Sequence, residues 1–314
     1  MSYHHEPVLL QEVLEHLNIH PGATVIDCTI GGGGHAGAML EAIGLNGRIL
    51  GIDRDRTAID AVQGKFASTI AEKRLVLVHD RFDNLEQRAK ECDFVAVDAV
   101  LFDLGASSYH FDTMARGFSF THDAPLDMRF DQSTGTTAAD IINSEKEGDL
   151  EKIFRNFGEE RLARVIASTI VRMRRTRRIT HTVDLAELIA AIYHGKRVHD
   201  RHIHPATRVF QALRIAVNDE FGALERALPQ ALRLMKSGGR LGLITFHSLE
   251  DRLVKQFFRS AVRGCICPVL FPVCRCGRKP ELTMVTRKGI RATPEEVEKN
   301  PRARSATLRV AEKI

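Results

Sequence analysis

The stretch that decides the fold is VIDCTIGGGGH at residues 25–35, together with GIDRD at 51–55. An apolar strand pattern runs into a glycine-rich loop, a helical pattern follows, and a second apolar strand ends at Asp53. In such an arrangement the glycines let the backbone approach a ligand closely, and the acidic residue after the second strand binds ribose hydroxyls. The pattern therefore predicts a site for a nucleotide-containing cofactor.

The glycine loop distinguishes two classes of cofactor. A dinucleotide site uses G-x-G-x-x-G, in which amides at the start of the helix bind a pyrophosphate. Here residues 31–34 are four consecutive glycines followed by His35, and Gly32 with Gly37 gives only a loose match to that motif. S-adenosylmethionine (SAM) carries no phosphate, and a loop that ends in histidine suits its zwitterionic amino acid tail. The loop therefore favours SAM, with a nicotinamide-dependent oxidoreductase as the rival class of enzyme.

Composition bounds the class of protein and its partners. The chain has 314 residues, of which 44% are hydrophobic and 27% charged, enough for a large α/β domain and a smaller one. A net charge of +5 permits a nucleic acid partner without requiring one. No apolar run is long enough to span a bilayer, and the N-terminus lacks the pattern of a signal peptide. We expect a cytoplasmic protein with no membrane partner.

Strand patterns recur along the chain at 24–28, 48–52, 75–79, 94–103 and 240–246. Helical patterns separate the early ones, and this alternation predicts an α/β fold whose parallel sheet is covered on both faces. The rhythm stops after residue 108, and segments 149–157, 159–175 and 183–194 are helical by periodicity. We therefore predict three stretches: 1–109 as the first part of the α/β domain, 110–204 as a helical insertion, and 205–314 as the second part with a C-terminal edge strand.

Polar residues at predicted strand ends are the candidates for chemistry. Asp103 ends a strand, and ligands of open α/β sheets bind beyond the carboxyl ends of the strands. We expect Asp103, Asp53 and the glycine loop to converge there, although Asp103 could instead cap a turn. Phe82, which follows another strand, is a candidate for stacking on an adenine ring or for the core. The segment 112–131 is dense in aromatic and charged side chains, which is typical of a binding loop or of a salt-bridged Ω-loop.

A basic cluster, RMRRTRR at 172–178, lies at the end of the second helical pattern of the insertion. Its arginines would bind a phosphate backbone well, whereas capping a helix C-terminus needs fewer cations. Basic stretches at 196–208 and 300–304 extend the charge, so we predict an extended anionic substrate, RNA or DNA. The candidate RNA-binding residues are Arg172, Arg174, Arg175, Arg177 and Arg178.

Four cysteines form a C-x-C-x6-C-x-C pattern. Four thiolates suffice for tetrahedral zinc, but structural zinc sites usually contain C-x2-C pairs, so we assign no metal and expect reduced surface thiols, with zinc as the alternative. The residues concerned are Cys265, Cys267, Cys274 and Cys276.

Taken together, the motifs closely resemble one family, the bacterial 16S rRNA cytosine-N4 methyltransferases known as RsmH or MraW. The resemblance runs nearly from end to end. The matching blocks are HEPVLL at 5–10, TIGGGGH at 29–35, GIDRD at 51–55, DLGASS at 103–108, RGFSF at 116–120, PLDMR at 125–129, FGEER at 157–161, HPATR at 204–208, FHSLED at 246–251 and NPRARS at 300–305.

The resemblance implies a Rossmann-like SAM-dependent methyltransferase sheet with an inserted all-helical domain. It implies methyl transfer from S-adenosyl-L-methionine to the exocyclic amine of a decoding-centre cytidine. The implied partner is 16S rRNA in the small ribosomal subunit, and a homodimer is a further candidate assembly. Carried over by position, the cofactor contacts are Gly33, Gly34, His35, Asp53, Phe82, Asp103 and His110; His110 departs from the common pattern, because Tyr-His stands where Pro-Gln is frequent.

The chemistry of the substrate selects the candidate catalytic residues. The lone pair of the cytosine amine is delocalised into the ring, so an acceptor that takes an N–H hydrogen bond would make the nitrogen more reactive. We predict that Asp103, or a backbone carbonyl beside it, faces the amine, with His247 and Ser248 as the second choice. A non-catalytic ribosome assembly factor that retains a SAM fold, and a DNA amine methyltransferase, are the remaining alternatives.

Overall fold

The computed structural model describes residues 7–105, 113–198, 203–263, 265–268, 271–273 and 275–314. The chain divides into two compact units. The first, called the sheet unit here, comprises Met1–Gly105 and Phe221–Ile314, and the second, the helical unit, comprises Ala106–Glu220. Among the described residues, no helix has the length and apolar character needed to cross a membrane.

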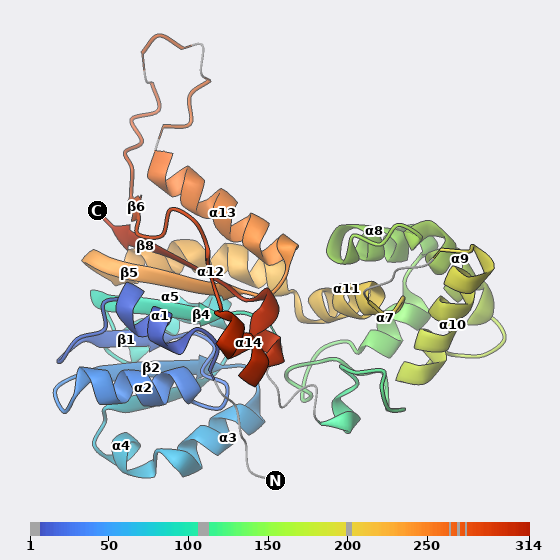
Figure 1. The fold of residues 1–314 in the computed structure, drawn as a ribbon, viewed down its shortest axis with the longest axis horizontal. Coiled ribbons are helices and arrows are strands. Elements are labelled where there is room, and N and C mark those ends of the chain that lie inside the picture. The colour runs from blue at the N-terminus through green and yellow to red at the C-terminus, as the bar shows by residue number, and fades with distance from the viewer. Residues whose placement is uncertain (1–6, 106–112, 199–202, 264, 269–270, 274) are drawn as a thin grey trace. The chain divides into compact units, whose positions relative to one another are not determined.

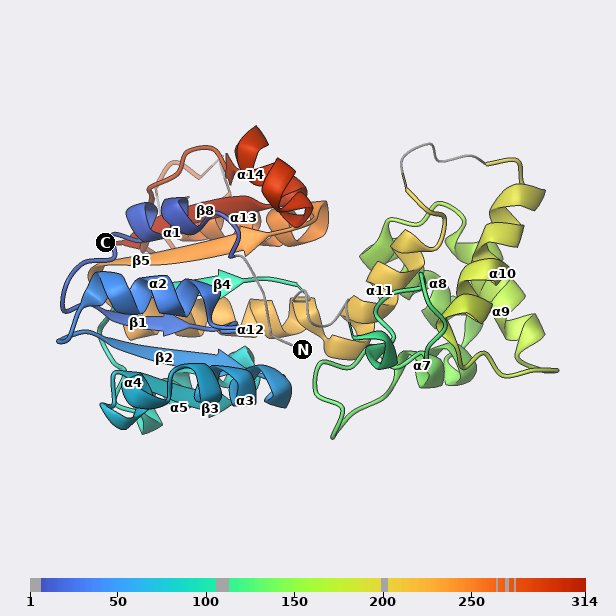
Figure 2. The ribbon, with the colours of Figure 1, turned by 60° about the horizontal axis from the view of Figure 1, so that its bottom comes forward.

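The sheet unit is built on one eight-stranded sheet (Figures 1 and 2). Its strands run in the order β3-β2-β1-β4-β5-β8-β6, and β7 also pairs with β8. Strands β1 to β5 are parallel to one another. Strand β8 is antiparallel to β5, β6 and β7. The strands are β1 (Thr24–Asp27), β2 (Arg48–Asp53), β3 (Leu75–His79), β4 (Val97–Asp103), β5 (Met235–Thr245), β6 (Leu282–Met284), β7 (Ile290–Arg291) and β8 (Thr307–Lys313).

Helices cover both faces of this sheet, because the central strands are apolar on both sides. One face packs against α1 (Leu10–His16), α2 (Gly34–Ile43) and α3 (Arg56–Lys65). The opposite face packs against α5 (Leu85–Glu91), α12 (Glu220–Leu234) and α13 (Ser248–Arg263). The remaining helices of the unit are α4 (Ala67–Ala71), α14 (Pro294–Lys299) and the short 3-10 turns Phe82–Asn84 and Pro301–Ser305.

The predicted α/β class with a parallel sheet is confirmed, and the C-terminal strand needs a correction. We expected an edge strand, but β8 lies inside the sheet, with β5 on one side and β6 and β7 on the other. The sequence did not reveal these two neighbours because β6 has three residues and β7 has two. Such short segments show no alternation that would distinguish them from a loop.

The helical unit contains α7 (Ala138–Ser144), α8 (Glu147–Gly158), α9 (Ala163–Met173), α10 (Thr182–Gly195) and α11 (Thr207–Asn218). Within its described part, the only β pairing is an isolated bridge between Pro125 and His181. The unit has its own core, formed by the apolar faces of these helices. The three helical segments expected here correspond to α8, α9 and α10, and α9 begins late because Glu159 adopts a left-handed conformation (φ 49°) that ends α8.

The end of the helical unit also differs from the expected boundary after residue 204. The unit continues to Glu220, because α11 buries Val209, Phe210 and Leu213 in its core. Close packing of α11 against α8 requires a glycine: a Cβ on Gly158 would lie 2.5 Å from the carbonyl oxygen of Arg208. The sequence showed the helix but not which core it belongs to, since that is decided by tertiary packing.

Candidate functional site

The carboxyl ends of the parallel strands carry three acidic residues along one edge of the sheet. Asp27, Asp53 and Asp103 are the last residues of β1, β2 and β4, and β1 lies between the other two strands. The glycine loop leaves from the end of β1, and β5 ends beside β4, where Asp103 pairs in register with Ile244. The structure therefore brings the glycine loop, Asp53 and Asp103 to one edge.

Asp53 fixes the glycine loop in place. Its Oδ2 accepts a hydrogen bond from the backbone N–H of Gly31 at 2.9 Å, and its Oδ1 accepts one from the N–H of Asp55 at 2.8 Å. The loop then turns into α2 at Gly33, whose φ of +72° is left-handed and whose added Cβ would lie 2.8 Å from Phe66 Cε2. A Cβ on Gly34 would lie 3.2 Å from the ring of Pro7. The backbone path thus requires a glycine at Gly33, and the neighbouring ring leaves little room for a side chain at Gly34.

His35 and Asp103 face each other beneath this loop. The imidazole is 5% exposed, and its Nε2 lies 2.9 Å from the carbonyl oxygen of Val8. Because a carbonyl only accepts, Nε2 carries a proton, which leaves Nδ1 facing Asp103 Oδ2 at 3.7 Å. The backbone N–H of Asp103 donates to Thr29 Oγ1 at 2.7 Å. Its Oδ1 is buried without a hydrogen-bond partner among the described residues, so a ligand donor would remove a desolvation cost there.

The electrostatics of this edge favour a cation. Burial first, and then the charges of the neighbouring Asp27 and Glu250, together raise the pKa of Asp103 to about 8. Burial also raises the pKa of Asp27 to about 7, with a contribution from Asp53, although a hydrogen bond from the Thr29 amide opposes it. A positive ligand would stabilise the ionised form of these carboxyl groups, whereas a pyrophosphate would oppose their ionisation. The donor set therefore fits SAM, which carries a positive sulfonium.

The end of β5 is held by a buried acid that sequence reasoning missed. Glu250, 2% exposed, accepts hydrogen bonds from the backbone N–H groups of Phe246 at 2.7 Å and His247 at 3.3 Å. Its Oε1 also lies 3.0 Å from His247 Nε2, which is close enough for an ion pair but lacks the geometry of a hydrogen bond. Ser248 follows as the first residue of α13. The candidates Asp103, His247 and Ser248 thus come from the ends of neighbouring strands.

Two of the acids, Asp27 and Glu250, were not among the predicted site residues. Both stand in motifs quoted above, VIDC and FHSLED. Their burial is what distinguishes them, and only tertiary structure reveals it.

Phe82 and His110 are the remaining predicted cofactor contacts. Phe82 begins a 3-10 turn three residues after β3, is half-buried, and packs edge-to-face against Phe102 with ring centroids 5.6 Å apart. Its contact with the core leaves part of the ring exposed, so the ring remains available for stacking. His110 lies outside the described residues.

The arginine cluster of the helical unit separates into two kinds of side chain. Arg174 is half-buried and donates to the carbonyl oxygens of Ile142 at 2.7 Å and Glu145 at 2.6 Å, so it caps the end of α7. Arg177 forms an ion pair with Asp184 at 2.9 Å. The exposed members are Arg172, Arg175, Arg177 and Arg178.

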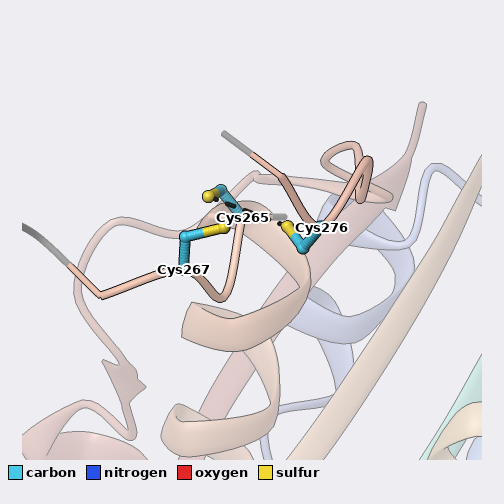
Figure 3. Close-up of side chains that lie close together, drawn as sticks. All are labelled: Cys265, Cys267 and Cys276. Atoms are coloured by element: carbon cyan, nitrogen blue, oxygen red, sulfur yellow. Dashed lines mark hydrogen bonds between the residues drawn. The ribbon is translucent and has the colours of Figure 1, made fainter. Parts of the chain in front are cut away.

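The cysteine pattern brings three thiols together on the loop between α13 and β6. The sulfur atoms of Cys265, Cys267 and Cys276 all lie within 4.8 Å of one another (Figure 3). Cys274, the fourth cysteine of the pattern, lies outside the described residues. Cys28 is buried, and Cys92 is half-buried.

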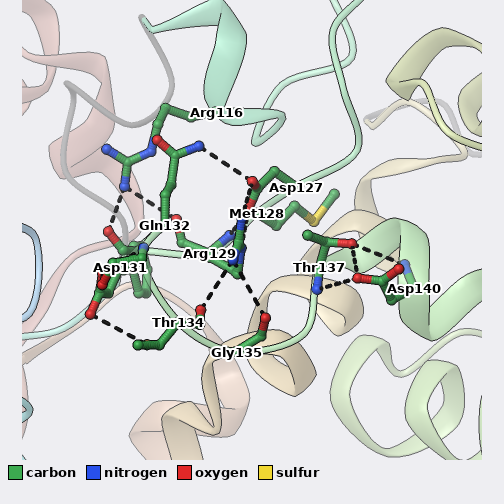
Figure 4. Close-up of polar contacts among 12 residues, drawn as sticks. Arg116, Asp127, Met128, Arg129, Asp131, Gln132, Thr134, Gly135, Thr137 and Asp140 are labelled. Atoms are coloured by element: carbon green, nitrogen blue, oxygen red, sulfur yellow. Dashed lines mark hydrogen bonds and ion pairs between the residues drawn. The ribbon is translucent and has the colours of Figure 1, made fainter.

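The segment predicted as a binding loop or an Ω-loop is tied together internally from residue 113 onward. Figure 4 shows Arg129 and Gln132 converging on Asp127, and both Nε and Nη2 of Arg129 lie 2.8 Å from that carboxylate. Arg116, 5% exposed, donates to the carbonyl oxygen of Phe130 at 2.6 Å. These charges therefore hold the loop's own conformation, as in a salt-bridged Ω-loop.

The sheet and its acidic edge together define a class of protein. A parallel order of 3-2-1-4-5 continued by an antiparallel strand, with a glycine loop after the first strand, is the arrangement of Rossmann-like SAM-dependent methyltransferases. Comparison with known proteins narrows the class. The sequence matches the MraW methylase family over residues 2–314, and the chain belongs to that family.

Two relatives that align over nearly the whole chain support this placement. A protein of Syntrophotalea carbinolica named "Ribosomal RNA small subunit methyltransferase H" is 49% identical, with 99% of this chain and 98% of that protein aligned. A protein of the same name from Symbiobacterium thermophilum is also 49% identical, over 100% and 98% of the two chains. A solved putative rRNA methylase from Clostridium thermocellum is 13% identical with a TM-score of 0.45, covering 98% of this chain and 97% of the other.

Proposed function

We propose that this enzyme methylates ribosomal RNA of the small subunit, transferring a methyl group from SAM to the exocyclic N4 of a decoding-centre cytidine in 16S rRNA. Membership of the MraW methylase family and the names of the relatives support the reaction and the class of substrate. The observation that carries the proposal is the acidic edge, where the buried Oδ1 of Asp103 has no hydrogen-bond partner among the described residues. A ribosomal substrate would place the enzyme in the cytoplasm.

The proposed cofactor site follows the edge from β2 to β4. Asp53 would bind the ribose hydroxyls. Its Oδ2 already accepts a hydrogen bond from the Gly31 amide, and a carboxylate oxygen can accept a second hydrogen bond, here from a hydroxyl. The amides around the glycine loop and the imidazole of His35 would face the amino acid tail, and Phe82 would stack on the adenine. The proposed cofactor-binding set is Gly33, Gly34, His35, Asp53, Phe82 and Asp103, and His110 belongs to it by resemblance alone.

In the proposed reaction SAM supplies the methyl group, and the residues of the chain align the substrate and accept its proton. When bound, SAM supplies a methyl group on a positively charged sulfur, so that the electron pair of the breaking C–S bond leaves with a neutral sulfur atom. The residues must hold the cytosine amine in line and accept its proton. Asp103 is the proposed acceptor, because a carboxylate with a pKa raised by burial binds a proton more tightly than an ordinary one.

The end of β5 is proposed to hold the base. His247 and Ser248 follow the strand that neighbours β4, so their polar groups would lie beside the amine held at Asp103. Glu250 is a positioning residue in this scheme. Its carboxylate accepts hydrogen bonds from the backbone of Phe246 and His247 and so holds the end of β5 in place.

The RNA must present an unpaired or flipped cytidine to this site, since a stacked base hides its exocyclic amine. We propose that the exposed arginines of the cluster bind the surrounding phosphates. Arg172, Arg175 and Arg178 are the strongest candidates. Arg174 and Arg177 have partners within the protein, at α7 and at Asp184, and would contribute less.

The test uses purified protein, SAM with a labelled methyl group, and small ribosomal subunits that lack the modification. Mass analysis of the nucleosides should find the label in N4-methylcytidine. Label in another nucleoside would overturn the acceptor, and SAM binding without transfer would favour the assembly-factor alternative.

Asp103→Asn should abolish most of the transfer at saturating SAM, whereas Asp98→Asn, at the opposite end of β4, is the matched control that should retain it. Equal rates for the two variants would contradict the role of Asp103.

A further inference from the structure

The three clustered thiols have the spacing of metal ligands. Sγ of Cys276 lies 3.8 Å from Sγ of Cys265, and all three sulfur atoms lie within 4.8 Å of one another. A disulfide would place two sulfur atoms about 2.05 Å apart. Tetrahedral zinc binds thiolates at about 2.3 Å, which separates neighbouring sulfur atoms by about 3.8 Å. The separation between Cys265 and Cys276 therefore matches the edge of a zinc tetrahedron and not a disulfide.

The cluster joins the two arms of a long loop. Residues 264–281 connect α13 to β6 along the chain, and Figure 1 shows the described parts of this segment extending beyond the end of α13. Cys265 and Cys267 lie on the arm that leaves α13, and Cys276 lies on the returning arm (Figure 3). Two apolar side chains of the loop are largely exposed, Ile266 at 65% and Val273 at 70%. The described part of this loop contributes no residue to the cores of the sheet unit, so apolar packing does not hold the arms together.

One backbone amide of the loop points at a sulfur atom of the cluster. The backbone N–H of Arg275 donates to Cys267 Sγ at 3.4 Å. An amide donor stabilises a thiolate, which is the form of cysteine that binds metals.

We propose that Cys265, Cys267 and Cys276 bind one Zn²⁺ ion, which fastens the two arms of the loop between α13 and β6. This reverses the starting expectation of reduced surface thiols without metal, which rested on the less regular C-x-C spacing. Thiolates select zinc over Mg²⁺ or Ca²⁺, which prefer oxygen ligands. The site is structural in character: it crosslinks a loop that is too long to be ordered by its ends alone.

The first experiment measures metal binding by the full chain. Protein stripped of metal under reducing, anaerobic conditions is titrated with Co²⁺, whose thiolate charge-transfer and ligand-field bands report sulfur ligation and tetrahedral geometry. We expect one Co²⁺ per chain with a tetrahedral spectrum, and its displacement by an equivalent of Zn²⁺. Protein that binds no Co²⁺, or that shows the spectrum of octahedral Co²⁺ without thiolate bands, overturns the proposal.

Variants assign the ligands. Cys265→Ser, Cys267→Ser and Cys276→Ser should each weaken Zn²⁺ binding at least tenfold. Cys92→Ser is the matched control: its half-buried thiol follows α5, outside the cluster, and its loss should leave binding unchanged. Equal effects of all four substitutions would contradict the assignment.

A measurement on the unaltered protein guards against variants that fail to fold. Alkylation of cysteines, followed by peptide mass analysis, is compared with and without one equivalent of Zn²⁺. The three cluster thiols should be protected at least tenfold by the metal, and Cys92 should react equally in both samples. Unprotected cluster thiols at full metal occupancy would overturn the proposal even if every variant were unstable.

Discussion

SAM binding should tighten as the pH rises from about 6 to about 8. The cofactor is a cation, and its proposed partner, Asp103, ionises only at a pH well above that of an ordinary carboxyl group. The pKa of Asp103 is raised to about 8 by burial, with Asp27 and Glu250 contributing. At pH 6 the carboxyl group is protonated in the free enzyme. A sulfonium placed beside it favours the ionised form, so binding must release a proton below pH 8.

The size of the effect follows from the fraction of enzyme that is ready to bind. With a pKa of about 8, Asp103 is ionised in roughly 1% of molecules at pH 6 and in about half at pH 8. If only the ionised form binds the sulfonium, the apparent dissociation constant falls roughly 50-fold over this interval and levels off above it.

Isothermal titration calorimetry measures both quantities this prediction concerns. Dissociation constants are collected across the interval, and titrations in two buffers of different ionisation enthalpy give the number of protons released. The α-amino group of SAM titrates in the same range. The decisive quantity is therefore the difference between wild-type protein and Asp103→Asn, whose amide neither ionises nor releases a proton.

The variant should bind SAM more weakly at pH 8 and lose most of the pH dependence. A wild-type affinity that is flat between pH 6 and 8 would refute the reasoning, because binding would then not depend on ionisation of Asp103. A full 50-fold change that persists in Asp103→Asn would refute it as well, since the titrating group would lie elsewhere.

Three further substitutions, two of them paired with a matched control variant, test packing and positioning. Gly158→Ala should lower the free energy of unfolding by about 1–3 kcal/mol through a clash with α11, whereas Gly148→Ala in the same helix meets open space and should leave stability unchanged or raise it by about 0.5 kcal/mol, as denaturant titration would measure. Arg174→Ala should cost about 1–3 kcal/mol by uncapping α7, whereas Arg175→Ala should change stability by less than about 0.5 kcal/mol and weaken RNA binding in a filter assay. Glu250→Ala, which removes the acceptor of both backbone hydrogen bonds, should slow single-turnover methyl transfer roughly tenfold with little change in SAM affinity, and an unchanged rate would refute its positioning role.

The parallel half of the sheet was predictable because its strands are buried on both faces. Strands of that kind are continuous apolar runs between turn signals, and 75–79 was placed to the residue as β3. The antiparallel half was not, because β6 and β7 are too short to carry a pattern. The position of β8 depends on those two partners, so it was mistaken for an edge.

Strand ends also located part of the site. Asp53 and Asp103 could be found because each ends an apolar strand, and parallel strands end at one edge. Glu250 could not, because its role depends on burial against the backbone of Phe246. Arg174 was grouped with its neighbours for the same reason: only the fold shows that its guanidinium caps another helix.

The small net charge of the chain combines an acidic cluster in the sheet unit with exposed arginines in the helical unit. The edge of the sheet unit gathers Asp27, Asp53, Asp103 and Glu250, and burial makes the pKa of Asp103 and that of Asp27 abnormally high. The helical unit exposes arginines that stay charged across the physiological range. A buried acidic site responds to pH and is little screened by salt, whereas exposed arginines on a phosphate backbone respond to salt and little to pH. Cofactor binding should therefore depend on pH more than on salt, and RNA binding on salt more than on pH. Each can then be weakened while the other is kept.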